Sequence, residues 1–190
     1  MGDVMIFAAQ LSFTEQAIVV AKLVMARILM IVTAPLHETK MMWILGPMIA
    51  SMLLMSLYFG RYKAEELGWN TAFGNSLVLI FASVDLLRFL FNKGTLFNFD
   101  LQNALVFAIV LQGILLTFLN YFHLMPKSIA FGISSGMTIN IVVMFLILLI
   151  YSDIKLDYIT AIACSILAIL FIIVIRILQM IQPTVIEDEE

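Results

Sequence analysis

Two ionisable side chains inside an apolar run are the strongest candidates for chemistry. Asp85 and Arg88 lie within residues 76–91, where nearly all the other residues are apolar. A charged side chain at the centre of a bilayer costs roughly 2.5–3.5 kcal/mol on insertion scales, so such a residue is a functional-site hypothesis. Their spacing of three residues places both on one helical face, where they can pair. The pattern predicts either an ion or proton site, with Asp85 as the acceptor, or a structural ion pair.

Lys22 and Arg27 are further basic residues in an apolar segment, 13–33. In a folded bundle they could meet Asp85 across helices and form a charged cluster. Residues 17–32 are otherwise so apolar that a spanning or steeply tilted helix is favoured. A helix that lies in the interface with its apolar face in the lipid is the alternative, and it stays open.

Small and polar residues form a second candidate region, where a GxxxG spacing lies inside an apolar run. Small residues allow helix backbones to approach closely, and hydroxyl groups can hydrogen-bond across the contact. A tight helix contact, within the chain or between chains, is therefore predicted, and a polar path through the bundle is the alternative. The candidate residues are Gly132, Ser134, Ser135, Gly136, Thr138 and Asn140, with Gln112 and Asn120 on the preceding segment.

Patterns typical of enzymes and metal sites are missing from the sequence. Neither His37 nor His123 has a second histidine four residues away, as a zinc-binding HExxH pattern requires. No Gly-Lys-Ser/Thr phosphate loop and no Gly-x-Ser-x-Gly elbow occurs. We therefore predict no metal site, no cofactor and no catalytic residue, although a lipid-modifying enzyme that uses one of the histidines stays a third hypothesis.

The composition decides which elements position these residues. The chain has 190 residues, 63% hydrophobic and 12% charged, whereas soluble domains are about 45–50% apolar and about 25% charged. A membrane-spanning helix needs about 20 mostly apolar residues. The sequence therefore predicts an all-α, polytopic transmembrane bundle of five or six helices in one domain. The first, partly charged helix is expected at 13–33, and spanning helices at 41–59, 71–91, 101–122, 129–151 and 159–181.

Local signals mark several helix ends. Ser12 and Glu15 have the spacing of a capping box, and Pro35 is expected to end the first helix. Asp100, Ser128 and Asp157 are predicted N-caps, because each precedes an apolar run. Short connections predict that sequential helices are antiparallel neighbours. Residues 184–190 are an acidic tail.

The leading functional hypothesis is a small channel or transporter subunit with a charged site inside the membrane. A non-enzymatic structural or assembly subunit of a larger membrane complex is the alternative. Because 190 residues is small for a self-contained transporter, we expect a homo-oligomer or other membrane subunits as partners, besides the lipid bilayer. The formal net charge of −3 argues against nucleic acid, which binds basic faces. The expected location is a membrane, with multiple passes.

Overall fold

The described residues of the computed structural model are 13–62, 68–98 and 100–183, and their regular structure is helical. Within them, six helical stretches are long and apolar enough to cross a membrane. The chain is thus a multi-pass, all-α membrane protein. The helices are α2 (Phe13–His37), the 3₁₀ turn η1 (Thr39–Met41), α3 (Met42–Arg61), α4 (Trp69–Lys93), α5 (Leu101–Tyr121), α6 (Lys127–Ile133), α7 (Gly136–Tyr151) and α8 (Tyr158–Ile181).

The ends of the helices agree with some local signals and correct others. The Asp100 and Asp157 side chains accept hydrogen bonds from the backbone N–H of Asn103 and Thr160, which confirms both N-caps. Ser128 is not a cap, because α6 begins after Pro126. Helix α2 continues through Pro35, since a proline in the last turn removes only one helical hydrogen bond. Ser12 and residues 184–190 lie outside the described residues.

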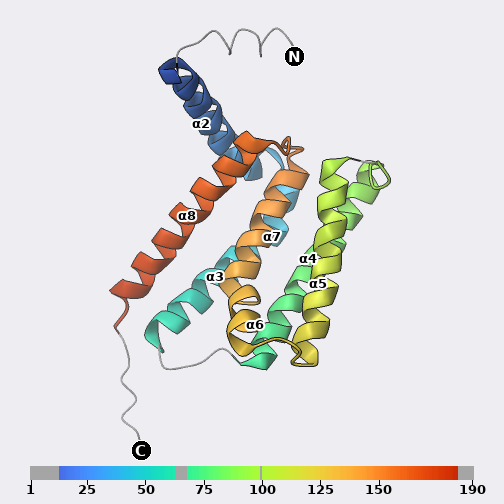
Figure 1. Cartoon of the computed structure of the whole chain (residues 1–190), viewed down its shortest axis with the longest axis vertical. Helices are drawn as coiled ribbons and strands as arrows, with labels where there is room; N and C mark the ends of the chain where they lie inside the picture. Colours follow the sequence, from blue (N-terminus) through green and yellow to red (C-terminus); the bar gives the residue numbers. More distant parts are fainter. Residues whose placement is uncertain (1–12, 63–67, 99, 184–190) are drawn as a thin grey trace, which may run out of the picture.

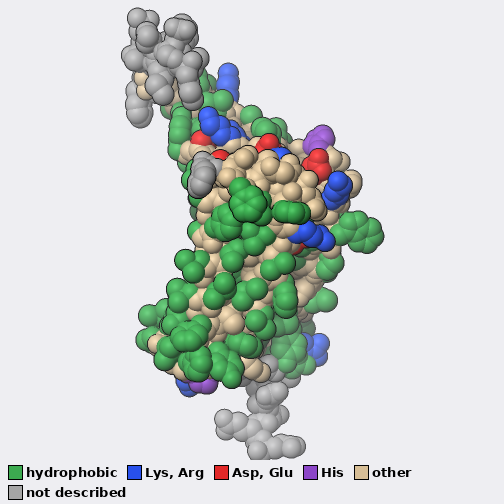
Figure 2. All heavy atoms as spheres, turned by 90° about the vertical axis from the view of Figure 1, so that its right-hand side faces the viewer, with side chains coloured by type: hydrophobic (Ala, Val, Ile, Leu, Met, Phe, Trp, Pro, Cys, Tyr) green, Lys and Arg blue, Asp and Glu red, His purple; other side chains and the backbone are tan. Residues whose placement is uncertain are grey.

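Loops gather at two ends of the molecule. We call the end formed by residues 38–41, 94–98 and 152–157 the upper end, as it lies in Figure 1, and the opposite end the lower end. At the upper end Lys93 pairs with Asp153 at 3.1 Å. On the face that Figure 2 shows, charged side chains gather towards the two ends and hydrophobic ones cover the middle. This distribution is the one expected of a chain whose middle faces lipid.

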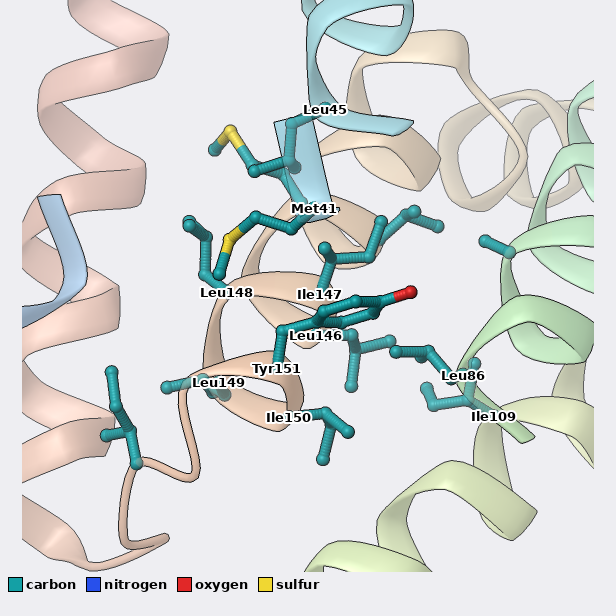
Figure 3. Packing of buried hydrophobic residues seen from close by; sticks show 14 of the residues in the cluster. Met41, Leu45, Leu86, Ile109, Leu146, Ile147, Leu148, Leu149, Ile150 and Tyr151 are labelled. Carbon is teal, nitrogen blue, oxygen red and sulfur yellow. The ribbon is translucent and has the colours of Figure 1, made fainter. Parts of the chain in front are cut away.

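Helix α7 is the centre of the packing. It contacts α2, α3, α4 and α6, and its side chains Ile147 and Ile150 are completely buried. Figure 3 shows these residues beside Met41 and Leu45, with Leu86 on the neighbouring helix α4. Helix α8 instead packs on α2 and α3. Of the sequential helices in the described ranges, only α4 and α5 form an extensive pair. The other sequential helices diverge, because a short loop brings two helix ends together but does not keep the helix axes side by side.

Helix α2 is held to the bundle by an ion pair near its middle. Arg27 lies 3.3 Å from the Asp157 carboxylate and donates a hydrogen bond to the Lys155 carbonyl. Figure 1 shows α2 crossing the start of α8, and Figures 1 and 2 both place its first turns beyond the upper end. Arg27 therefore contacts the α7–α8 loop and not Asp85.

The closest helix contacts occur at glycines other than those of the GxxxG spacing. A Cβ atom added at Gly113 of α5 would lie 3.1 Å from Ile80 Cγ1 and 3.4 Å from the Ile80 backbone nitrogen of α4. A Cβ atom at Gly132 would meet nothing within 4 Å. Gly113 thus sets the approach of α4 and α5, whereas Gly132 faces open space in this chain.

We expect Gly113→Leu to destabilise the α4–α5 pair by about 1–3 kcal/mol, the usual cost of overpacking a core. The matched control Gly132→Ala should leave the free energy of unfolding within about 0.5 kcal/mol of the wild-type value. Thermal unfolding in detergent, followed by circular dichroism, measures both. Equal stability of Gly113→Leu and the wild type would contradict the assigned contact.

The Asp157 carboxylate should make the stability of the α2–α8 contact depend on pH. Hydrogen bonds from Thr160, and also the charge of Arg27, lower the pKa of this carboxyl below its usual value of 3.8. A lowered pKa stabilises the folded state above the unfolded pKa, and this contribution is lost as the pH falls through the folded pKa. The contribution of Asp157 to stability should therefore be fully present above about pH 3.8 and be lost as the pH falls further below that value.

The variant Asp157→Ala should lose about 1 kcal/mol through the missing cap, whereas Asp157→Asn keeps the cap and should lose less. Both are measured by thermal unfolding at pH 7. If Asp157→Asn is as damaged as Asp157→Ala, the ion pair with Arg27 and not the cap carries the effect.

Candidate functional site

Asp85 of α4 is bound by two side chains from two helices. Arg88 Nη2 donates to Asp85 Oδ1 one turn along the same helix, so the ion pair predicted by the spacing of three residues is present. The Tyr151 hydroxyl of α7 donates to Asp85 Oδ2 at 2.7 Å. The Asp85 side chain is 17% exposed and that of Arg88 is 69% exposed. A carboxylate held from α7 and α4 at once links the two helices.

Tyr151 is positioned for this contact by its aromatic neighbour. Its ring stacks on Phe89 of α4, with ring centroids 4.0 Å apart and planes 22° from parallel. Figure 3 shows the Tyr151 hydroxyl pointing away from α7 toward the helix that carries Leu86. Since Asp85 lies eight residues before the end of α4 at Lys93, it is roughly 12 Å from that end. The carboxylate therefore lies at membrane depth.

A cavity of about 1120 Å³ opens beside this cluster at the upper end. Its walls come from α2, η1, α3, α4 and the end of α7, and the lining includes both Arg88 and Tyr151, the two partners of Asp85. Its other charged or titratable lining residues are His37, Glu38, Lys40, Lys93 and Asp153. The cavity thus leads from the upper end to the side chains that hold Asp85.

A second polar cluster lies in the lower half of the bundle. The Asn120 amide of α5 donates to Ser134 Oγ at 2.8 Å and to the Ala72 carbonyl of α4 at 3.2 Å. Asn75 of α4 donates to the Ser134 carbonyl at 2.8 Å. Both Asn120 and Ser134 are buried, and Asn120 Oδ1 is a buried acceptor without a partner in the described part of the chain. This cluster joins α4 and α5 to the residues between α6 and α7.

The fifth membrane crossing is broken at this cluster. The sequence predicts one helix over 129–151, but α6 ends at Ile133 and α7 begins at Gly136. Ser135 caps α7 by accepting a hydrogen bond from the Thr138 backbone N–H, and Asn75 satisfies the freed Ser134 carbonyl. A break at membrane depth is tolerated because protein groups replace the missing helical bonds. Discontinuous helices of this kind surround the binding sites of many transporters.

An apolar layer separates the two polar clusters. On α4 the residues of the hydrophobic core between Ser76 and Asp85 are Leu79 and Ala82, and on α7 those between the break and Tyr151 include Val143 and Ile147. Leu79, Val143 and Ile147 are each at most 1% exposed. Ser83, also buried there, donates to its own helix at the Leu79 carbonyl. The upper cavity is therefore closed toward the lower end by packed aliphatic side chains.

The other predicted residues lie apart from Asp85. Lys22 is exposed on α2 and Arg27 is paired with Asp157, so the predicted charged cluster with Asp85 does not form. Gln112 is exposed on α5. Thr138 donates to the Gly132 carbonyl, Asn140 donates to the Gly136 carbonyl of its own helix, and Gly136 lies against Asn75.

The two histidines lie at opposite ends of the molecule. His37 lines the upper cavity, whereas the ring of His123 stacks on Trp69 at the lower end, with centroids 4.2 Å apart. Within the described ranges, no group of three His, Cys, Asp or Glu side chains could hold a metal ion. The arrangement provides no pair of histidines for a shared reaction centre.

Sequence reasoning missed Tyr151 and Asn75. Tyr151 ends an apolar run, a position where aromatic residues are typical of membrane interfaces. Asn75 belongs to the polar entry of α4. Nothing in the local pattern of either residue indicates its distant partner.

Comparison with known proteins adds no assignment to this geometry. No protein-family model, no curated protein and no solved structure matches the chain.

Removal of the Asn120 amide should destabilise the lower cluster. Asn120→Ala leaves the Ser134 hydroxyl and the Ala72 carbonyl without this donor, and an unsatisfied buried polar group costs about 1–3 kcal/mol. The matched variant Gln112→Ala removes an exposed amide on the same helix and should cost less than about 0.5 kcal/mol. Chemical or thermal unfolding in detergent compares the two, and equal losses would argue against a buried network.

Proposed function

We propose that this protein is a small transport subunit of a carrier type, with Asp85 at the centre of its charged site. The observation that carries this proposal is a carboxylate at membrane depth whose two side-chain partners, Arg88 and Tyr151, line a cavity open at one end. Ionisable groups inside membranes mark ion pathways and proton relays.

A carrier is favoured over an open channel because the path is closed below the cavity. Leu79, Val143 and Ile147 fill the space between the two polar clusters. Transport would therefore require α7 to move relative to α4, so that access to Asp85 alternates between the two ends. Helix α7 can tilt at the break between Ser134 and Ser135 without losing helical hydrogen bonds. The Ser134 carbonyl there already accepts from Asn75, and the Thr138 backbone N–H already donates to the Ser135 hydroxyl.

The chemical role of each residue follows from its contacts. Asp85 is the acceptor for a proton or cation, and Arg88 and Tyr151 compensate its charge while the site is empty. A cation or proton that binds Asp85 neutralises the carboxylate and so weakens the hydrogen bond that it accepts from Tyr151. The link between α7 and α4 is weakened as a result. Occupation of the site is in this way coupled to the packing of the two helices that must move.

Flux through proteoliposomes tests the proposal. We expect purified wild-type protein to carry protons or monovalent cations, and Asp85→Asn to lower the rate by about tenfold or more or to abolish its pH dependence; a tenfold change corresponds to about 1.4 kcal/mol. Tyr151→Phe should alter the rate without removing the Asp85 carboxylate. Asp100→Asn, which removes a carboxylate outside the cavity and keeps a side chain that can cap α5, is the matched control and should behave as wild type.

All variants must first elute as helical, monodisperse species. Absence of flux from correctly folded wild-type protein would reject the carrier and favour the assembly subunit, for which partners that co-purify are the next measurement. Equal flux in the wild type and in Asp85→Asn would reject Asp85 as the centre of the site.

A further inference from the structure

The upper cavity carries basic groups that the protein itself satisfies only in part. Arg88 uses Nη2 for Asp85 and also interacts with Tyr151, but a guanidinium group carries further N–H donors, and 69% of the Arg88 side chain is exposed. Lys40 is exposed and forms no ion pair with a described residue. Lys93 is already paired with Asp153. Two cationic groups of the lining are therefore available to an anion that enters from outside.

Arg88 lies close to the boundary between the hydrocarbon core and the headgroup region. Helix α4 has 25 residues and is roughly 37 Å long at 1.5 Å per residue, whereas the hydrocarbon core of a bilayer is about 30 Å thick. Its ends must therefore extend into the headgroup region. Arg88 lies five residues before the end of α4, roughly 8 Å from it, and 69% of its side chain is exposed beside the cavity.

The lining combines these charges with apolar side chains on the same cavity. Met30 of α2, Ile44 of α3 and Phe89 of α4 are lining residues, and Trp43 stands at the cavity with 85% of its surface exposed. Tryptophan is enriched at the level where headgroups meet acyl chains. A ligand that fits this lining has an anionic head and an apolar body.

We propose that the upper cavity is a binding site for a phospholipid, with the headgroup phosphate on Arg88 and Lys40 and the upper part of the acyl chains against Trp43, Ile44 and Met30. A guanidinium group presents planar paired N–H donors that match the oxygens of a phosphate. Glu38, the acidic lining residue without an ion pair in the described ranges, accepts hydrogen bonds from the ammonium or hydroxyl group of the head.

Binding of this kind gives Arg88 a second anionic partner besides Asp85. The phosphate and the carboxylate then compete for one guanidinium group, so that lipid at the cavity weakens the hold of Arg88 on Asp85. The inference goes beyond the proposed carrier function, because lipid binding is measured without any flux. Binding without flux would leave the inference standing and reject the carrier, and flux without binding would do the opposite.

Quenching of Trp43 by brominated lipid tests the site. The chain has two tryptophans, so Trp69→Phe leaves Trp43 as the single reporter at the cavity. Phosphatidylglycerol with brominated acyl chains is titrated into this protein in detergent. We expect saturable quenching, and an apparent Kd at least tenfold weaker in Arg88→Gln and in Lys40→Gln. Lys127→Gln, which changes a basic residue of α6 at the lower end, is the matched control and should bind as the parent does.

Two results would overturn the proposal. One is equal quenching by brominated diacylglycerol, which lacks the phosphate, and the other is binding by Arg88→Gln or by Lys40→Gln that equals binding by their parent. Inorganic phosphate separates the two sources of the anion. If inorganic phosphate displaces the lipid only at concentrations far above the lipid concentration, the result supports the proposal. If phosphate displaces the lipid at an equal concentration, the cavity is a site for a free anion.

Discussion

The lack of hydrogen-bonding solvent in the bilayer is the constraint on which this structure depends. Every backbone and side-chain polar group at membrane depth must find a partner inside the protein. The isolated hydroxyl groups solve this locally: Thr33, Thr117 and Ser165 each donate to the carbonyl four residues earlier on their own helix. The Asn140 amide bonds in the same way to the Gly136 carbonyl, whereas Asp85 and Asn120 have partners on other helices.

That requirement explains why the polar residues are grouped and not dispersed. Asp85 accepts hydrogen bonds from Tyr151 of α7 and from Arg88 of its own helix. Asn120 donates hydrogen bonds to the Ser134 hydroxyl and to the Ala72 carbonyl. Each group therefore ties α4 to a second segment. Between the groups, α4 and α7 meet through Leu79, Val143 and Ile147, which contribute packing but no directional bonds. A helix pair joined by polar contacts at its ends and by aliphatic contacts in the middle can tilt about that middle more easily than one joined by hydrogen bonds throughout.

The break between α6 and α7 follows from the same constraint. Loss of helical bonds inside a membrane would cost several kcal/mol for each unsatisfied group, and Asn75 and Ser135 offset this by bonding to the freed backbone. The polar residues around Ser134 therefore make the break possible, because they bond to the backbone groups that the break frees. Arg27 shows the same principle at the upper end, where the charge in α2 is compensated by Asp157 and by the Lys155 carbonyl.

The class of protein follows from composition alone, because 63% hydrophobic residues exceed what a soluble domain of this size can bury. It also determined most helix segments, the Asp100 and Asp157 caps, and the pairing of Asp85 with Arg88. Each of these depends on residues close together in the chain, where spacing along a helix fixes geometry.

Contacts between groups that are distant in the chain depend instead on how the helices pack. In a soluble protein the apolar stripe of a helix indicates its buried face, but lipid accepts apolar side chains as readily as a protein core does. Hydrophobic periodicity therefore did not indicate that α7 is central, that Gly113 and not Gly132 makes the close contact, or that Arg27 binds Asp157 and not Asp85. The role of Tyr151 and the cavity lining could not be predicted from the sequence either. These residues share a site only once helices α2, α3, α4 and α7 lie side by side.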